Sequence, residues 1–151
     1  MTCYEQRAVE LFRKGCNCSQ AVFAAFSDVT GIDESTAIKM SAPFGGGLGR
    51  LREVCGAVSG MSLAAGCLWG YSDLDDKEQK TEHYKLISGM ANRFADIMGG
   101  TYICRDILKL TDTAYSPVAE ERTAEFYSLR PCERCVAVAA GILEEELKNR
   151  K

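Results

Sequence analysis

The chain has 151 residues, of which 46% are hydrophobic and 26% are charged, and its formal net charge is −3. A chain of this length and composition can bury a core of its own, so we expect one globular domain over residues 1–151 that needs no disulfides for stability. The negative net charge and the scattered lysines and arginines argue against nucleic acid or an anionic membrane surface as a partner.

The predicted elements are all helical, because apolar residues recur at helical spacing and no stretch alternates with a period of two. The main predicted helices span, in chain order, residues 4–12, about 19–30, 34–40, 54–69, 75–98 and 131–147, with shorter helical segments after Cys104 and over 118–127. Asp33 is suited to cap the third helix, Asp75 or Asp76 the fifth, and Gly99-Gly100 to end the fifth. The sequence therefore predicts an all-α fold, an irregular bundle of five to seven helices.

One segment has the length of a membrane span. Val54–Tyr71 contains no charged residue, but it is rich in glycine and serine, and Arg52 and Glu53 precede it directly. These features favour a central, buried helix. Residues 1–5 show neither a basic and apolar leader nor a twin-arginine start, so we expect a cytoplasmic protein.

Eight cysteines are the most informative residues of the chain. Cytoplasmic thiols stay reduced unless they take part in chemistry, so this number indicates metal binding or redox work. Cys67, within the apolar run, and Cys3 are interpreted instead as small buried hydrophobic residues.

Four of the cysteines share one structural circumstance, which is a position at or next to a predicted helix start. They are Cys18, Cys55, Cys104 and Cys132. A helix N-terminus favours the thiolate through its free N–H groups, and the thiolate is both the reactive form of cysteine and the form that ligates metals. Four such positions on four helices can converge at one end of a bundle, and we expect their sulfur atoms to share one small site.

Two pairs of cysteines are also close in sequence. Cys16 and Cys18 form a CxC pair, and Cys132 and Cys135 form a CxxC pair that suits a redox dithiol or half of a zinc site. Haem attachment is not expected, because Val136 rather than histidine follows the CxxC pair. The only histidine, His83, is expected at the core or its boundary, and not as a ligand.

The glycine-rich loop 43–49 does not match a nucleotide-binding pattern. Arg52 occupies the place of the third glycine of GxGxxG, no strand precedes the loop, and no lysine-serine or lysine-threonine pair follows it. We therefore expect no nucleotide. The loop is better suited to letting the backbone approach a cluster or another helix while it delivers Cys55.

The segment Cys55-Gly56-Ala57-Val58-Ser59-Gly60 reads CGAxxG and follows Phe44-Gly45-Gly46-Gly47-Leu48-Gly49-Arg50. Together with Asn17-Cys18-Ser19-Gln20-Ala21-Val22 and the later cysteines, it resembles the C-GCAxxG-C-C family of redox-active proteins over nearly the whole chain. The four cysteines that describe this family correspond to Cys18, Cys55, Cys104 and Cys132. Cys3, Cys16, Cys67 and Cys135 lie outside that pattern, so their roles stay open.

The resemblance also implies a cofactor. The family is similar to a domain of split-Soret cytochromes, in which cysteines of this kind hold an iron–sulfur centre beside the haems. Since this chain has no haem motif, only the iron–sulfur centre is implied here.

Three hypotheses about function remain open at this stage. The first is electron transfer or redox sensing through an iron–sulfur cluster held by Cys18, Cys55, Cys104 and Cys132. The second is an enzyme, a metal-free thiol–disulfide oxidoreductase that uses Cys132 and Cys135 or two of the first four. The third is a structural zinc site.

The expected partners follow from these hypotheses. A redox partner protein, either an oxidoreductase or an electron carrier, is expected. A homodimer is a further prediction, with the Gly56/Gly60 helix or the apolar last helix at its interface.

Overall fold

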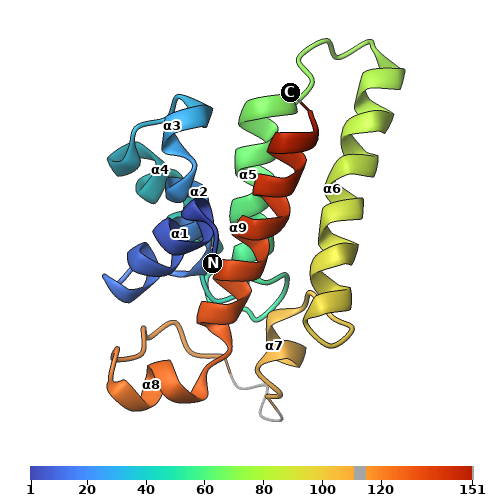
Figure 1. Cartoon of the computed structure of the whole chain (residues 1–151). Coiled ribbons are helices and arrows are strands. Elements are labelled where there is room, and N and C mark those ends of the chain that lie inside the picture. The colour runs from blue at the N-terminus through green and yellow to red at the C-terminus, as the bar shows by residue number, and fades with distance from the viewer. Residues whose placement is uncertain (111–114, 151) are drawn as a thin grey trace.

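The computed structural model describes residues 1–110 and 115–150, and every regular element within them is helical. Nine α-helices and one 3-10 helix form there: α1 (Cys3–Arg13), α2 (Cys18–Ala25), α3 (Ser27–Thr30), α4 (Glu34–Ser41), η1 (Ala42–Phe44), α5 (Gly56–Trp69), α6 (Lys77–Ile97), α7 (Cys104–Ile107), α8 (Ala124–Leu129) and α9 (Cys132–Asn149). Figure 1 shows α5 and α9 at the centre, with α1 to α4 on one side and the long α6 on the other. The predicted all-α class is confirmed.

The predicted helix count of five to seven is wrong, because the described chain contains nine α-helices. Several of them are one or two turns long, and so short a helix shows too few residues for a periodic pattern. Phe26, whose φ of −101° and ψ of 18° are not helical, separates the single turn of α3 from α2. The segment predicted to be helical from Val118 onward has no regular secondary structure up to Thr123, whose side chain caps α8 by accepting a hydrogen bond from the N–H of Phe126.

The ends of the longer helices lie close to where the sequence predicts them. Asp33 caps α4 and Asp76 caps α6, each accepting a hydrogen bond from a backbone N–H at 3.0 Å. At the other end of α6 the chain turns with positive φ at Gly99 and Gly100, and the N–H of Gly100 donates to the carbonyl of Ala95. Local signals were therefore sufficient for these boundaries.

The central helix α5 packs closely against α2 because its glycines admit the neighbouring backbone. A Cβ on Gly60 would lie 2.5 Å from the carbonyl oxygen of Ser19, and a Cβ on Gly56 would lie 3.3 Å from the Cβ of Cys18. The two glycines thus serve a contact inside the chain, and the face of α5 that carries them is covered by α2. This close approach also sets the distance between the starts of α2 and α5, where two of the cysteines lie.

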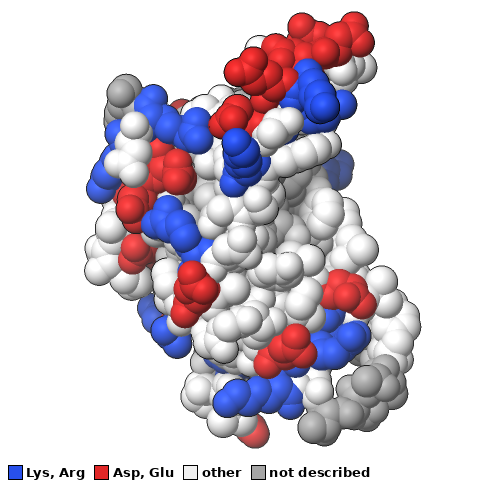
Figure 2. All heavy atoms as spheres, turned by 90° about the vertical axis from the view of Figure 1, so that its right-hand side faces the viewer, with Lys and Arg blue, Asp and Glu red and all other residues white. Residues whose placement is uncertain are grey.

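Charged side chains of both signs are mixed on the face of the molecule that Figure 2 shows. Acidic and basic groups lie side by side at the top, along the left side and near the bottom of this view, and its centre is largely uncharged. Among the described residues, no helix combines the length and the apolar character that crossing a membrane requires. The uncharged run that resembled a span is instead the packed helix α5.

Two interpretations of single cysteines are wrong. Cys67 is exposed and lines an apolar groove between α5 and α6, and Cys3 is exposed in the first turn of α1. The apolar residues of α5 surround the helix, so its pattern does not reveal which side faces solvent. His83 does lie at the boundary of the core, edge-on to Tyr71 at 5.9 Å between ring centroids.

Candidate functional site

The first turn of α2 places Cys18. The side chain of Asn17 accepts a hydrogen bond from the N–H of Gln20, and the side chain of Gln20 accepts one from the N–H of Asn17, both at 2.9 Å. This capping box satisfies two backbone donors at the start of the helix and fixes its first residue, which is Cys18.

A β-bridge between Val54 and Ile103 places Cys55 and Cys104 beside each other. The N–H of Cys55 donates to the carbonyl of Tyr102 at 2.8 Å, and the N–H of Cys104 donates to the carbonyl of Glu53 at 2.6 Å. Each cysteine directly follows a bridge residue and begins a helix, Cys55 as the cap of α5 and Cys104 as the first residue of α7. Two helix starts that are far apart in sequence are therefore held at one place by backbone hydrogen bonds.

The glycine-rich loop folds back on itself to deliver this bridge. Gly47 has a φ of 73°, and a Cβ there would lie 2.6 Å from the nitrogen of Glu53. The N–H of Glu53 donates to the carbonyl of Gly47 at 3.0 Å, which closes the loop just before Cys55. As expected from the sequence, the glycines permit a close backbone approach.

The start of α9 contributes two more cysteines. Cys132 is the first residue of the helix after Pro131, and Cys135 follows one turn later. Cys135 is 1% exposed and belongs to the hydrophobic core, whereas Cys132 is half-buried.

Five cysteines line one cavity of about 520 Å³ at this end of the bundle: Cys18, Cys55, Cys104, Cys132 and Cys135. The structure thus brings together the four cysteines that share a helix-start position and adds Cys135 to them. Cys3, Cys16 and Cys67 do not line this cavity.

The thiols interact in two pairs. The Cys18 thiol hydrogen-bonds Cys132, and this bond lowers the pKa of Cys132 to about 7, aided by nearby arginines. The same bond and burial raise the pKa of Cys18. Cys135 likewise donates to Cys55, which lowers the pKa of Cys55 and strongly raises that of Cys135. Each pair therefore combines one cysteine of lowered pKa with one of raised pKa, and the CxxC cysteines are each paired with a different partner.

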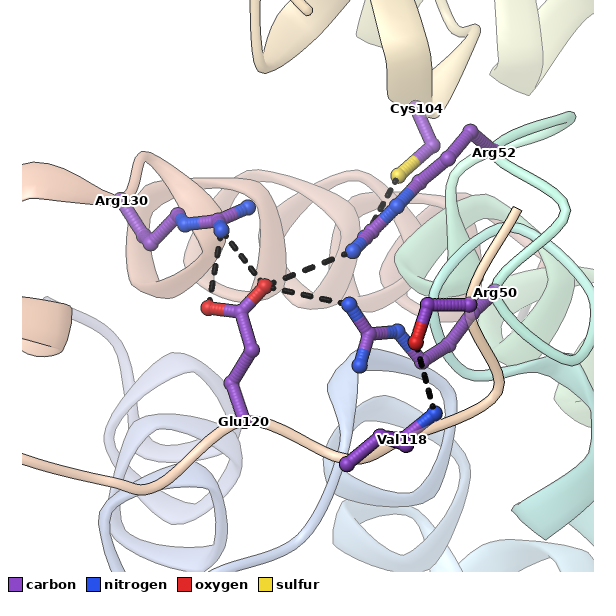
Figure 3. A network of polar contacts seen from close by, with 7 residues as sticks. Arg50, Arg52, Cys104, Val118, Glu120 and Arg130 are labelled. Atoms are coloured by element: carbon purple, nitrogen blue, oxygen red, sulfur yellow. Dashed lines mark hydrogen bonds and ion pairs between the residues drawn. The ribbon is translucent and has the colours of Figure 1, made fainter. Parts of the chain in front are cut away.

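Four arginines surround the cysteines: Arg50, Arg52, Arg122 and Arg130. Figure 3 shows Arg50, Arg52 and Arg130 converging on the carboxylate of Glu120, and Arg52 also reaching toward Cys104. The Nη1 of Arg52 lies 3.7 Å from the Sγ of Cys104. Burial raises the pKa of Cys104, and this guanidinium opposes the shift.

Arg122 is fixed by the body of the protein. Its guanidinium donates to the carbonyls of Phe12 at 3.2 Å and Cys16 at 2.9 Å. It also lies over the rings of Phe12, Phe126 and Tyr127, with its Cζ 4.5 to 5.7 Å from their centroids. This cation helps to lower the pKa of Cys132.

The arginines, Glu120 and the place of Cys135 were not predicted from the sequence. Arg50 and Arg52 border the glycine-rich loop, and this position is the only local signal for them. Nothing near Glu120 in the sequence distinguishes it from other surface acids, because its role depends on long-range contacts.

Within residues 1–110 and 115–150, no three of the histidine, cysteine, aspartate and glutamate side chains are placed to share one ion. A cluster of several iron atoms is bound by ligand atoms that lie further apart than those around a single ion. The donor set fits such a group, since four thiols from four helices line one cavity with cationic walls.

One of the comparisons with known proteins found a family match. A protein-family profile described as "Putative redox-active protein (C_GCAxxG_C_C)" matches residues 16–146. The chain belongs to this family. The matched range contains all five cysteines of the cavity and leaves out Cys3. In this chain the middle motif reads Cys55-Gly56, whereas the family label has glycine before cysteine. Comparisons with curated proteins and with solved structures found no match.

Proposed function

We propose that this family member is an electron-transfer or redox-sensing protein, in which Cys18, Cys55, Cys104 and Cys132 hold an iron–sulfur cluster. The observation that supports the proposal best is the cavity that these four thiols line together, because a dithiol alone needs no such space. The cluster, when bound, would accept and release single electrons.

The chain's own residues suit this role in three ways. The capping box of α2 and the bridge Val54–Ile103 fix the cysteine backbones before any ligand arrives. Arg52 and Arg130 offset the negative charge of ligating thiolates. The thiol of Cys135 donates a hydrogen bond to Cys55 from the core side, and a hydrogen bond of this kind orients a ligand atom.

The test is to load the anaerobic protein with iron and sulfide and to record iron content, sulfide content and the visible spectrum. We expect the parent and Cys67→Ser to give the same brown product, because Cys67 lies outside the cavity. Cys55→Ser should lose most of the bound iron. Equal iron loss in Cys55→Ser and Cys67→Ser, or a colourless parent, would contradict the proposal.

The second candidate is a metal-free thiol–disulfide oxidoreductase, and it is favoured by the contact between Cys18 and Cys132. The Cys132 thiolate would attack a substrate disulfide, break its S–S bond and release one thiolate. The Cys18 thiol, after losing its proton, would then attack the Cys132 sulfur and release the second thiol, leaving a Cys18–Cys132 disulfide. Mild oxidation of cluster-free protein followed by peptide mapping should find this disulfide, and not Cys132–Cys135.

A further inference from the structure

Residues 115–123 have no regular secondary structure, and this segment contributes Glu120 to the lining of the cysteine cavity. Residues 115–121 are exposed. From Tyr115 to Arg122, no backbone–backbone hydrogen bond joins this segment to another described residue. Side chains therefore hold it, through the ion pairs of Glu120 and the carbonyl contacts of Arg122.

Three guanidinium groups meet at the Glu120 carboxylate. The Nη2 of Arg130 lies 2.6 Å from Oε1 and 2.8 Å from Oε2. The Nη2 atoms of Arg50 and Arg52 lie 3.2 and 3.5 Å from Oε1. We refer to Arg50, Arg52 and Arg130 as the arginine clamp, and Figure 3 shows it closed on Glu120.

Two members of the clamp are held in an unfavourable backbone conformation. Arg50 and Arg52 have φ values of 68° and 62°, in the left-handed region that side chains other than glycine rarely adopt. Two hydrogen bonds within the loop stabilise this backbone conformation. The N–H of Arg50 donates to the carbonyl of Gly45, and the N–H of Arg52 donates to the carbonyl of Gly46. Strain of this kind gathers at binding sites, where it orients side chains toward a ligand.

The cavity has more positive charge than Glu120 can balance. Four arginines and no lysine line its described part, and Glu120 is the only carboxylate among these lining residues. This excess occurs in a chain whose net charge is −3, and the face in Figure 2 carries charges of both signs. A concave site with an excess of one charge concentrates ligands of the opposite charge.

We propose that the arginine clamp is a binding subsite for small organic anions that carry a carboxylate, and that Glu120 is its internal competitor. The carboxylate of a ligand would replace the carboxylate of Glu120 on the clamp, so that one anion exchanges for another. The 115–123 segment would then move aside. Arginine suits a planar carboxylate, and the Nη2 of Arg130 already contacts both carboxylate oxygens of Glu120. Because Arg52 contacts both Glu120 and Cys104, the rest of a bound ligand would lie against the cysteines.

The test compares two disulfide probes of different charge on the reduced, cluster-free protein. 5,5′-Dithiobis(2-nitrobenzoate) carries two carboxylates, and 4,4′-dithiodipyridine is neutral. Each reacts with a protein thiolate by cleavage of its S–S bond, which leaves a mixed disulfide and releases one chromophore, the thionitrobenzoate thiolate from the first probe and, after protonation, neutral 4-thiopyridone from the second. Because Cys3 and Cys67 are exposed, both are replaced by serine in every variant, and the Cys132 phase is identified by its loss in Cys132→Ser.

The quantity measured is the ratio of the dianion rate to the neutral rate at Cys132. The neutral rate corrects for changes in the thiolate itself. Glu120→Gln should raise this ratio about fivefold, the scale expected from removing a partly exposed ion pair that competes for the clamp. Arg50→Gln should lower it by a similar factor. Arg93→Gln, which removes an arginine that pairs with Glu145 and Glu146 on α9, is the matched control and should leave the ratio unchanged.

The proposal would be overturned by equal changes in both rates in Glu120→Gln, because the effect would then lie in the thiolate or in opening of the segment. An unchanged ratio in Arg50→Gln would overturn it as well. Failure of the protein to load iron would leave this test intact, because the measurement uses cluster-free protein.

Discussion

The hydrogen bond from Cys18 to Cys132 makes a prediction about reactivity that can be worked out from the site. In the reduced protein this bond is the largest cause of the lowered pKa of Cys132, which is about 7, and the arginines contribute less. At pH 7 a thiol with this pKa is half ionised, whereas a thiol at the ordinary value of about 8.5 is ionised to about 3%. Cys18→Ala should therefore reduce the thiolate fraction of Cys132 at pH 7 by up to about 15-fold.

The assay is pulsed alkylation of the reduced, cluster-free protein with iodoacetamide between pH 5.5 and 9.5, read at the Cys132 peptide by mass spectrometry. The parent should show a midpoint near pH 7, and Cys18→Ala should move it upward. Cys16→Ala is the matched control, because Cys16 lies two residues away in sequence but outside the cavity. Identical midpoints in the parent and Cys18→Ala would refute the paired-thiol arrangement.

Three further predictions concern stability. The hydrogen bond to Cys55 and burial raise the pKa of Cys135. The Cys135 thiol therefore contributes to the free energy of unfolding below the ordinary thiol pKa of about 8.5, and this contribution is lost as pH rises above that value. The reduced parent should thus lose stability to urea between pH 8.5 and 10, and Cys135→Ala should lose less over that range. Gly60→Ala should cost about 1–3 kcal/mol because its Cβ would meet the α2 backbone, whereas Gly66→Ala, with open space there, should be neutral or stabilising in urea unfolding. Arg122→Ala should cost about 2 kcal/mol through two lost hydrogen bonds to carbonyls, and an unchanged urea midpoint would contradict this.

The helix starts were predictable because their signals are local. A cap such as Asp33 acts within three residues, and the Gly99-Gly100 turn acts within one turn of α6. The same locality explains why the helix-start cysteines could be recognised. Each is fixed by its own turn, and only their convergence depends on the rest of the fold.

The remaining site residues could not be predicted because they depend on long-range contacts. Cys135 joins the cavity through the packing of α9 in the core, and Glu120 is fixed by arginines from distant parts of the chain. The exposure of Cys67 depends on which side of an apolar helix faces α6. None of these long-range contacts produces a periodic or local pattern in the sequence.

The two candidate functions require different protonation states of the cysteines that line the cavity. A dithiol works with one thiolate and one thiol, which is how Cys132 and Cys18 are paired. Iron ligation needs every ligand as a thiolate, and because the pKa values of Cys18 and Cys104 are raised, both of these thiols must lose a proton on loading. If the cluster proposal holds, iron loading should slow steeply as pH falls from 8.5 to 6.5, while oxidation to the Cys18–Cys132 disulfide should follow only the ionisation of Cys132. A rate of iron loading that stays flat over this range would show that these thiols do not lose protons on binding, and the four-cysteine ligand set would fail.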